Sequence, residues 1–503
     1  MGPNPFLRGA PSILNFENKK MEYKMKKSIL FVGAEVMPFA ATGGLGDVLG
    51  SLPTALAAKG VDVRVVMPLY SAVGEKYRAE MKKEAEFTAY LAWRQQYCGV
   101  YSLQKDKVTY YFIYNEYYFA REGLYGQYDD GERYAFFCTA VLEMLPHIGF
   151  FPDILHAHDW QAALSVVYLR QKYSQDERYA GIRRVFTIHN IEYQGKYDFY
   201  ILGDVFALSE ADRGVVEYDG CINLMKGAIE CAEAVTTVSQ RYADEIMSPE
   251  YSHGLYHILR RYADKVSGIL NGIDYAYYNP WTDPVLAKHY SPKRRGGKDA
   301  CRSALRADLN LEDDNKVPVI SLITRLASHK GLDIVAEAIR GILDETGAQL
   351  VVLGKGEAKY EEFFKALEAE RPDKVRALIT YDRDLSRRIY AATDIFMMPS
   401  KSEPCGLSQM IASRYGAIPV VRETGGLADS ILPYWEDKEG AMHGNGFTFA
   451  GYTAGELYER TVAATALWKN GEKRKAFVEK IMTVDFSWAA SADKYIALYN
   501  DLL

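Results

Sequence analysis

Short runs of apolar and β-branched residues alternate with longer amphipathic stretches along almost the whole chain. Most of these runs are continuously apolar, which is typical of strands buried on both faces of a sheet. The runs occupy residues 28–35, 62–70, 153–159, 183–190 and 234–239, and then 317–326, 348–356, 376–382, 394–400 and 418–424. Strand and helix therefore alternate in two series, which predicts an α/β protein with two doubly wound, Rossmann-like domains facing across a cleft.

A segment rich in Gly, Asn, Asp and Pro, residues 268–284, separates the two series. We therefore expect an N-terminal domain over residues 25–267 and a C-terminal domain over residues 268–484. Residues 485–503 follow an aromatic break and are expected to form an amphipathic helix that could close either domain. Residues 1–24 fit no periodic element, and we interpret them as a disordered leader or a remnant of cloning.

Composition narrows the function classes. The length of 503 residues fits two or three domains, and a net charge of −6 argues against a broad binding surface for nucleic acid. The six cysteines are scattered, no secretory signal is visible, and no apolar run is long enough to span a bilayer. We therefore expect a cytoplasmic protein without a membrane partner. The 38 tyrosines could supply surfaces that stack on flat rings, including sugar faces, although most aromatic side chains belong in cores.

The first apolar run leads into a glycine-rich turn, ATGGLGDVLG from Ala41, and then into a helix. Gly43, Gly44 and Gly46 allow a close backbone approach, and the N–H groups at the start of the helix suit an anion. The spacing matches neither the dinucleotide-binding fingerprint nor the Walker loop. Taken alone, the turn fits an anion site and a tight strand-to-helix connection equally well.

Two further strand ends in the first half carry polar residues. His156, His158 and Asp159 end one run, and His189 and Asn190 end another. Strand alternation puts both histidines of the first run on one face, which suits either a metal site or one core histidine and one cleft histidine. We find no matching cluster of ligands elsewhere and expect no metal.

In the second half, Arg325 and Lys330 follow a strand and precede a helix. They could converge on one diphosphate, as a guanidinium fork and a point charge, or they could be solvated surface cations. Asp382 and Asp384 resemble a metal-binding pair, but they open a helical run, so we expect Asp384 to be its N-cap.

Two more strand-to-helix turns in the second half carry glycine. Glu403 precedes Gly406, and its carboxylate would suit sugar or ribose hydroxyls, while Gly425 and Gly426 precede another helix. Together these turns favour a nucleotide with a diphosphate. Since ligands of open α/β sheets bind at the carboxyl ends of the strands, we expect the active site in the cleft between the domains.

The motifs, taken in order, resemble those of the bacterial glycogen synthase and plant starch synthase family, which are retaining glucosyltransferases of the GT-B fold. The resemblance runs from about Ser28 to the C-terminus and rests on TGGLGDV, HAHDW, TIHNIEYQG, LMKGAIECAEAVTTVS, GLYHILRR, GILNGID, RLASHKGLD, SKSEPCGLSQM and RETGGLADSI. It implies transfer of glucose from ADP-glucose, or from UDP-glucose, to the non-reducing 4-hydroxyl of glycogen or a maltooligosaccharide. Configuration would be retained, and neither a metal nor another cofactor would be needed.

The resemblance also implies roles for single residues. Arg325 and Lys330 would neutralise the departing diphosphate, and Glu403 would hold the donor glucose and support positive charge on its ring. Asp159 and His189 would line the glucose pocket, and the last helix would return to the first domain so that closure joins two half-sites. The other implied donor contacts are Thr42, Gly43, Gly44, Tyr381 (stacked on adenine), Cys405, Gly406, Leu407, Thr424, Gly425 and Gly426.

One position departs from the family pattern: Ala41 stands where a lysine usually precedes TGGL. Another cation could substitute, the donor could differ, or the enzyme could be impaired; we favour an active synthase because Arg325, Lys330 and Glu403 are all present. Two alternatives remain. One is a GT-B transferase with another donor or a small acceptor, against which the segment 126–145 argues because it resembles the wide first domain of this family. The other is a glucan-binding homologue without catalysis, which only Ala41 supports.

Overall fold

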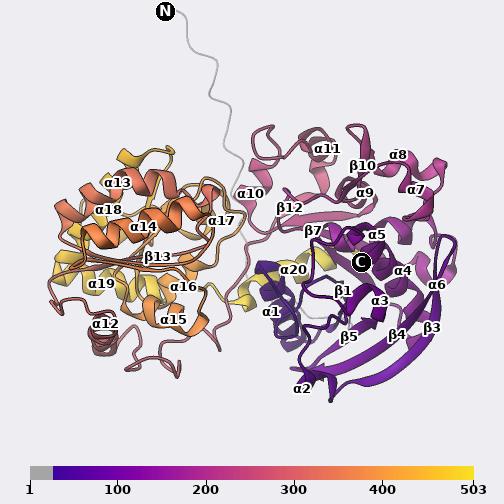
Figure 1. The fold of residues 1–503 in the computed structure, drawn as a ribbon, viewed down its shortest axis with the longest axis horizontal. Helices are drawn as coiled ribbons and strands as arrows, with labels where there is room; N and C mark the ends of the chain where they lie inside the picture. The colour runs from indigo at the N-terminus through magenta and orange to yellow at the C-terminus, as the bar shows by residue number, and fades with distance from the viewer. Residues whose placement is uncertain (1–26) are drawn as a thin grey trace, which may run out of the picture.

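The computed structural model describes residues 27–503, which form two halves, each built on one sheet (Figure 1). The leader expected over residues 1–24 lies outside the described residues. All five strands predicted in the first half are present and mutually parallel: β1 (Ser28–Val32), β2 (Asp62–Pro68), β6 (Ile154–His158), β7 (Arg183–Ile188) and β11 (Ala234–Thr237). The strand β1 lies in the middle, with Phe31 paired to Val65 on one side and to His156 on the other.

The first sheet extends further than the sequence predicted. Its order is β12-β11-β7-β6-β1-β2-β5-β4-β3, and the four additional strands are β3 (Lys82–Leu91), β4 (Arg94–Lys105), β5 (Val108–Tyr114) and β12 (Val266–Gly268). The strands β3, β4 and β5 pair antiparallel with one another at the outer edge. In β3 exposed and less exposed positions alternate, so this strand shows no continuous apolar run of the kind that marked the others.

The second sheet is entirely parallel, in the order β15-β14-β13-β16-β17-β20. Its strands are β13 (Val319–Ile323), β14 (Gln349–Leu353), β15 (Val375–Leu378), β16 (Ile395–Met398), β17 (Ile418–Arg422) and β20 (Phe447–Phe449), of which only β20 was not predicted. Two small sheets lie outside the main ones: β8 (Lys196–Tyr197), β9 (Glu217–Tyr218) and β10 (Cys221–Asn223) form one, and β18 (Trp435–Glu436) and β19 (Met442–His443) form the other.

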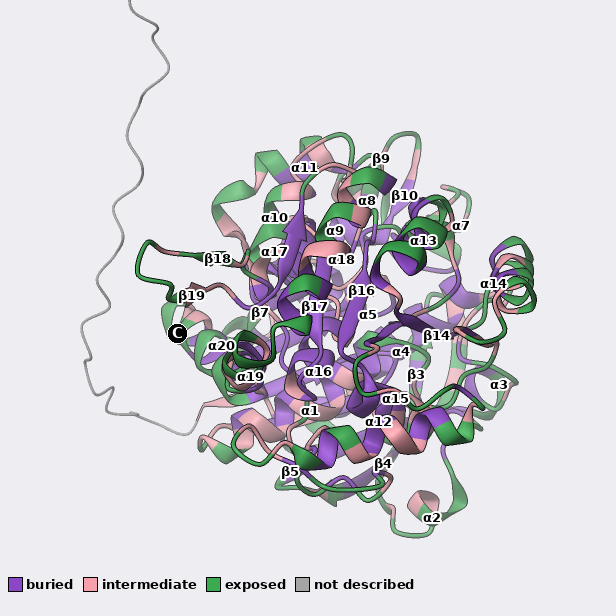
Figure 2. Ribbon diagram, turned by 90° about the vertical axis from the view of Figure 1, so that its left-hand side faces the viewer, coloured by how far each residue is buried: buried purple, intermediate pink, exposed green. Residues whose placement is uncertain are grey.

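Helices cover both sheets, and the strands lie buried between them (Figure 2). In the first half these are α1 (Gly44–Ala58), α2 (Glu75–Arg78), α3 (Glu116–Phe119), α4 (Asp130–Ile148), α5 (Asp159–Gln171), α6 (Glu177–Ala180), α7 (Ile201–Asp204), α8 (Arg213–Val216), α9 (Leu224–Cys231), α10 (Gln240–Glu245) and α11 (Tyr256–Arg261). In the second half they are α12 (Gly296–Asp308), α13 (Leu332–Thr346), α14 (Ala358–Glu370), α15 (Arg383–Ala392), α16 (Ser408–Arg414), α17 (Gly425–Ser430), α18 (Ala454–Lys469) and α19 (Gly471–Met482). Within residues 27–503, no helix combines the length and the apolar character needed to cross a bilayer.

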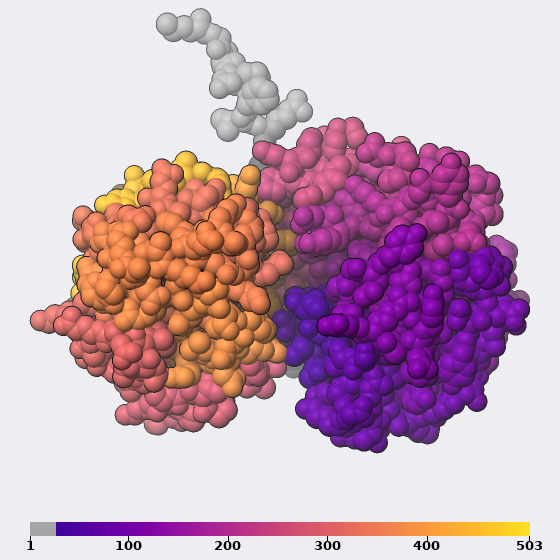
Figure 3. All heavy atoms as spheres, viewed as in Figure 1, coloured from indigo at the N-terminus to yellow at the C-terminus, as the bar shows by residue number. Residues whose placement is uncertain are grey.

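The last helix, α20 (Trp488–Leu502), packs against the first half of the chain. Lys59, the residue that caps the C-terminus of α1, pairs with Asp493 at 2.7 Å, and the hydroxyl of Tyr499 lies 2.8 Å from Nδ1 of His156. The chain therefore crosses between the halves twice, and the two crossings touch, since the N–H of Ile273 donates to the carbonyl of Phe486 over 2.8 Å. Figure 3 shows the surface hollowed between the two halves.

Candidate active site

Most of the predicted site residues follow the strands at the two places where strand order reverses. In the first sheet β1 and β6 are neighbours, and the next strand after β1 lies on one side of the pair while the next strand after β6 lies on the other. In the second sheet β13 and β16 are related in the same way. Such switch points leave a crevice at the carboxyl ends of the strands. The loop of Thr42 follows β1 and Asp159 follows β6, while Arg325 and Lys330 follow β13 and Glu403 follows β16.

The glycine-rich loop after β1 is held by a buried carboxylate that the sequence analysis missed. Glu35, 4% exposed, accepts the N–H groups of Thr42 at 2.5 Å and of Gly43 at 3.0 Å, and also the hydroxyl of Thr42 at 2.8 Å. The hydroxyl of Tyr125 donates to the same carboxylate. Within the described chain, the N–H groups of Gly44 and Leu45 at the start of α1 donate to no other residue. These two amides are therefore the ones that the loop can offer to an anion.

Asp159, at the start of α5, has an unusual backbone conformation. Its φ is +58°, which is uncommon for a residue other than glycine and typical of functional positions. Its Oδ1 accepts the N–H of His189 at 2.7 Å, which ties the end of β6 to the end of β7. Burial raises the pKa of Asp159 to about 7, although the N–H groups of His189 and Asn190 oppose that shift.

His189 reaches the site, whereas His156 and His158 lie behind it. Both of the latter are fully buried, so the alternative in which one packs in the core and the other lines the cleft is wrong. The ring nitrogens of His156 contact the hydroxyls of Tyr499 at 2.8 Å and Thr187 at 2.6 Å. The two histidines do share one face, as strand alternation predicted, with ring centres 4.2 Å apart.

The contact between His158 and His189 indicates which tautomer His189 adopts. Nδ1 of His158 lies 2.9 Å from Nε2 of His189, and the buried Nε2 of His158 has no partner among the described residues. A buried N–H without an acceptor costs more free energy than a buried lone pair without a donor, so Nε2 of His158 carries no proton. We therefore assign the proton to Nδ1 of His158, which donates to Nε2 of His189. Burial lowers the pKa of His189 to about 3, so the ring is neutral and its Nδ1–H is a donor toward the cleft.

In the second half, Lys330 and Glu403 form an ion pair. Nζ of Lys330 lies 2.6 Å from Oε2 of Glu403, and the hydroxyl of Ser400 donates to the same oxygen over 2.9 Å. Glu403 is 7% exposed. Its Oε1 accepts from no other residue of the described chain, so one oxygen is anchored and the other is available to a ligand.

The other predicted residues of this half differ in their surroundings. Arg325 is exposed and pairs with no carboxylate within residues 27–503, and Tyr381 is 80% exposed. The N-cap of α15 is Asp382, not Asp384 as we predicted. Asp382 stands just before the first helical residue, so its carboxylate can accept the N–H groups of Asp384 and Leu385, both at 2.9 Å.

The turn at Gly425 wraps closely around the loop of Glu403. Gly425 has a φ of +44°, and a Cβ there would lie 2.0 Å from the carbonyl oxygen of Glu403. Its N–H donates to the carboxylate of Glu245 over 3.0 Å, and the hydroxyl of Thr424 donates to the same group. The N–H of Gly426 is also engaged, by the carbonyl of Glu403. Cys405, Gly406 and Leu407 form the neighbouring turn into α16, and Cys405 is buried.

Glu245 belongs to α10 of the first half, so this contact joins the halves beside the site. The hydroxyl of Ser239 donates to the carbonyl of Pro404 over 2.6 Å in the same region. Elsewhere between the halves, Oδ1 of Asp47 in α1 lies 3.8 Å from a guanidinium nitrogen of Arg383 in α15. The two halves therefore meet at the turns after β16 and β17, beside Glu403, and again between α1 and α15.

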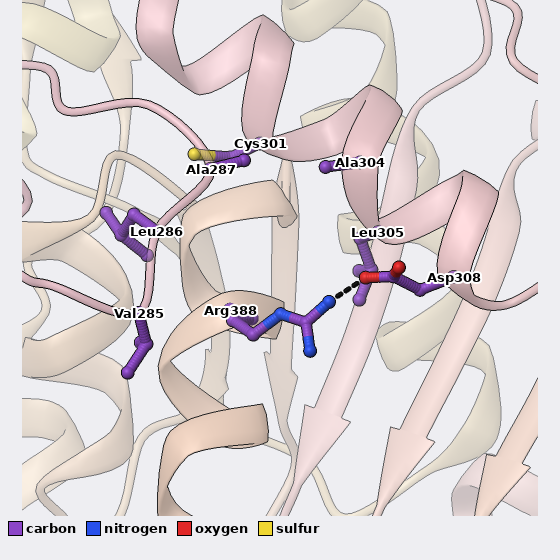
Figure 4. Close-up of a pocket in the computed structure, with 8 residues that line it drawn as sticks. All are labelled: Val285, Leu286, Ala287, Cys301, Ala304, Leu305, Asp308 and Arg388. Atoms are coloured by element: carbon purple, nitrogen blue, oxygen red, sulfur yellow. Dashed lines mark ion pairs between the residues drawn. The ribbon is translucent and has the colours of Figure 1, made fainter.

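A separate cavity of about 240 Å³ lies between α12, α15 and the linker (Figure 4). Apolar side chains line it together with Cys301, and an ion pair joins Arg388 to Asp308 (Figure 4). It contains none of the strand-end residues and is not the candidate site. No group of three or more His, Cys, Asp or Glu side chains in residues 27–503 has an arrangement that could hold a metal.

Comparison with known proteins gives the family. A model of the starch synthase catalytic domain matches residues 28–261, and a model of group 1 glycosyl transferases matches residues 305–481. Glycogen synthases from Anoxybacillus flavithermus and Lactobacillus acidophilus are each 43% identical to the chain over 477 residues, which are 94% of this chain and 98% and 99% of theirs. The chain belongs to the bacterial glycogen synthase and plant starch synthase family.

Solved structures agree with this assignment. The catalytic domain of starch synthase IV from Arabidopsis thaliana, bound to ADP and acarbose, superposes with a TM-score of 0.86 at 35% identity, covering 95% of this synthase and 99% of that chain. Sucrose-phosphate synthase from Thermosynechococcus elongatus, 18% identical with a TM-score of 0.58, shares the fold. The predicted family, the GT-B fold and the class of enzyme, a retaining glucosyltransferase that extends α-1,4-glucans, are confirmed.

Three residues of this site were not predicted from the sequence: Glu35, Ser400 and Glu245. Glu35 and Ser400 each follow a strand at a switch point, and the rule that predicted their neighbours would have found them. Glu245 has no such signal, because it is the last residue of a helix and its carboxylate accepts the N–H of Gly425 in the other half of the molecule.

Proposed function

We propose that this synthase takes ADP-glucose as its donor and transfers glucose to the non-reducing 4-hydroxyl of glycogen or of a maltooligosaccharide. The single observation that carries the proposal is the Glu403 carboxylate, anchored through Oε2 by Lys330 and Ser400 and open at Oε1. ADP is supported by the Arabidopsis relative, which was solved with ADP and acarbose. The exposed ring of Tyr381 can stack on the base of either nucleotide.

During transfer, the bond between glucose and the diphosphate breaks, the acceptor oxygen bonds to the same face of the sugar, and the proton of the acceptor hydroxyl passes to the departing diphosphate. Negative charge then grows on the departing diphosphate. We propose that Arg325, free of a carboxylate partner in the described chain, and the ammonium of Lys330 meet that charge. No metal is required for this step in our proposal, since the two cations supply the positive charge.

The free Oε1 of Glu403 is suited to accept a donor sugar hydroxyl and to stabilise positive charge on the sugar ring. In the first half, the neutral His189 donates its Nδ1–H to a glucose hydroxyl, and Asp159 holds His189 through its backbone N–H. The amides at the start of α1, with Thr42 and Gly43 fixed by Glu35, approach the donor phosphates from the other side. All six cysteines, which lie within the described residues, are free thiols, which supports the cytoplasmic location that the sequence suggested.

Release of nucleotide during incubation with glycogen and either ADP-glucose or UDP-glucose tests this proposal. We expect faster release with ADP-glucose, accompanied by growth of the glucan. Faster release with UDP-glucose would overturn the donor assignment, and release only with a small acceptor would indicate another GT-B transferase. No release with either donor, with glycogen still bound, would favour the glucan-binding homologue that Ala41 suggests.

A further inference from the structure

Carboxylates surround the first turn of α1, where the glycine-rich loop offers its free amides. Asp47 belongs to that turn, and Glu35 holds the loop just before it. Burial raises the pKa of Asp47; Arg383 opposes this shift, and the carboxylates of Glu35 and Asp274 add to it. The partners of Glu35 among residues 27–503 are amide and hydroxyl groups, not cations. A phosphate bound at these amides would therefore meet like charge unless a cation from elsewhere offsets it.

A guanidinium from the other half of the molecule reaches this turn. Arg383 is the first residue of α15, and one of its guanidinium nitrogens lies 3.8 Å from Oδ1 of Asp47. No other cation of the described chain pairs with Asp47. The free amides of Gly44 and Leu45 belong to the same turn, and one turn of helix rises only about 5.4 Å. Arg383 and a phosphate on those amides would therefore be close neighbours.

Arg383 differs from the other two arginines of α15 in how its charge is used. Arg387 is hydrogen-bonded to two carboxylates, at 2.7 and 2.6 Å, and Arg388 forms an ion pair with Asp308 (Figure 4). The contact between Arg383 and Asp47 is longer than a hydrogen bond, and both side chains are partly exposed. Arg383 is therefore the arginine of this helix whose N–H donors are available to a ligand.

The side chain of Arg383 is held beside the linker between the halves. Its guanidinium lies 5.1 Å from the ring centre of Tyr277, and the guanidinium of Arg387 lies 4.4 Å from the same ring. The hydroxyl of Tyr278 is another neighbour of Arg383. Aromatic rings can hold a guanidinium in place without neutralising its charge.

Arg383 also lies on the path that a donor nucleotide would take. Tyr381, whose ring can stack on the base, precedes it by two residues in the same segment. The amides of the first turn of α1 suit the phosphates, and Arg383 contacts that turn. A donor whose base rests on Tyr381 and whose phosphates reach α1 must therefore pass beside Arg383.

We propose that Arg383 binds the donor phosphates from the second half and supplies the positive charge that the loop at Ala41 lacks. The inference rests on the proposed function, because the phosphates are those of the donor. Without a donor, Arg383 screens the charge of Asp47; with a donor bound, its guanidinium forms charge-assisted hydrogen bonds to a phosphate. Because Arg383 reaches α1 only from across the cleft, the contact also couples donor binding to the approach of the two halves.

Binding of ADP to Arg383→Met, measured by calorimetry, tests the inference without catalysis. Methionine keeps an apolar stem beside Tyr277 and removes the charge. We expect the Kd for ADP to rise about 10-fold, the low end of the range for a hydrogen bond to a charged group. The matched control is Arg388→Met, because Arg388 lies on the same helix but pairs with Asp308 at the separate cavity; its Kd for ADP should equal that of wild type.

Two double variants identify how Arg383 acts. Ala41→Lys should restore most of the ADP affinity of Arg383→Met, since it returns a cation to the phosphates from the other side, whereas Ala41→Gln should not. In an Asp47→Asn background, Arg383→Met should still raise the Kd about 10-fold. No effect of Arg383→Met in that background would mean that Arg383 acts only by pairing with Asp47, and would overturn the inference.

The remaining outcomes separate this inference from the proposed function. An unchanged Kd for ADP in an Arg383→Met protein that still transfers glucose would overturn the inference and leave the function intact. A raised Kd in a protein that transfers no glucose would support the phosphate contact while the proposed function fails. The same titrations with UDP cover the other donor, and a wild type that binds neither nucleotide would overturn both. If Arg383→Met does not fold, Arg383→Gln decides.

Discussion

The Nζ of Lys330 lies 2.6 Å from Oε2 of Glu403, and this ion pair joins the loops that follow β13 and β16. The pair orients one carboxylate oxygen and leaves the other open. It also places a positive charge beside the group expected to contact the donor sugar. The ammonium of Lys330 can therefore orient the Glu403 carboxylate before transfer and stabilise the negative charge of the departing diphosphate during transfer.

The different surroundings of the two cations predict different consequences of removing them. Arg325→Ala and Lys330→Ala should each lower kcat. Each removes a preorganised positive charge from beside the leaving group, which should raise the activation barrier by about 2–4 kcal/mol. Only Lys330→Ala should also lower the melting temperature, by the equivalent of about 1–3 kcal/mol, since it leaves the buried carboxylate of Glu403 unpaired. Steady-state kinetics and thermal unfolding of the same preparations measure both effects.

Lys330→Met is a suitable companion variant because it keeps most of the side-chain volume without the charge. Rates close to wild type in either alanine variant would mean that the cation is structural and not part of the transfer step. An equal loss of melting temperature in both variants would contradict the distinction between an exposed and a paired cation.

Position 41 should respond to a restored cation. We expect Ala41→Lys to raise kcat or to lower the KM for the donor, because the loop after β1 now offers only amides and a helix end to the phosphates. Initial rates at varied ADP-glucose concentration measure the effect, with Ala41→Gln as the uncharged control. Equal rates for Ala41→Lys and wild type would show that the site functions without this cation.

Transfer should not depend on a divalent cation. We expect full activity after dialysis against EDTA, because the charge on the leaving group is met by Arg325 and Lys330. Loss of activity that added Mg²⁺ or Zn²⁺ restores would contradict this and would direct attention to His156, His158 and Asp382.

Ala41 and Gly46 should be coupled. A Cβ at Gly46 would lie 2.3 Å from the Cβ of Ala41, so Gly46→Ala should strain the loop by about 1–3 kcal/mol. This cost exceeds the gain of up to about 1 kcal/mol that alanine brings to a helix interior. Adding Ala41→Gly removes the clashing methyl group and should recover much of the loss. Urea denaturation of the two single variants and the double variant measures the coupling, and strictly additive effects would exclude it.

The raised pKa of Asp159 predicts how stability depends on pH. Its native pKa of about 7 lies above the ordinary value of 3.8, so between these pH values the unfolded chain has lost a proton that the folded protein keeps. Wild type should therefore lose stability relative to Asp159→Asn as the pH rises from about 4 to 7, and the difference should level off above pH 7. Asparagine keeps an oxygen acceptor for the N–H of His189 and tolerates the positive φ.

Thermal unfolding of both proteins at five pH values across that range provides the test. The difference between the two melting temperatures isolates Asp159 from the buried histidines, which are common to both proteins. A difference that does not change with pH would show that Asp159 is ionised throughout.

Ten strands were predictable because their apolar runs are local, and all ten predicted strands are present, whereas the buried β20 was missed because it has only 3 residues. The edge strand β3 was not predicted, because its exposed and less exposed positions alternate and it lacks that continuous run, and its neighbours β4 and β5 were missed with it. The misplaced N-cap at Asp384 had a similar origin. The sequence shows that a helix begins near that residue, but only the backbone determines whether Asp382 or Asp384 is the residue just before the first turn.

By itself, the sequence determined the two series of strands, the family, and the strand ends at which chemistry had to be sought, since apolar periodicity and glycine-rich turns are properties of short segments. The tertiary structure alone decided which charges meet. Lys330 and Glu403 are separated by 73 residues, and Glu245 and Thr424 by 179. Their contacts depend on the strand order of the sheets and on how the two halves face one another, and no local pattern specifies either.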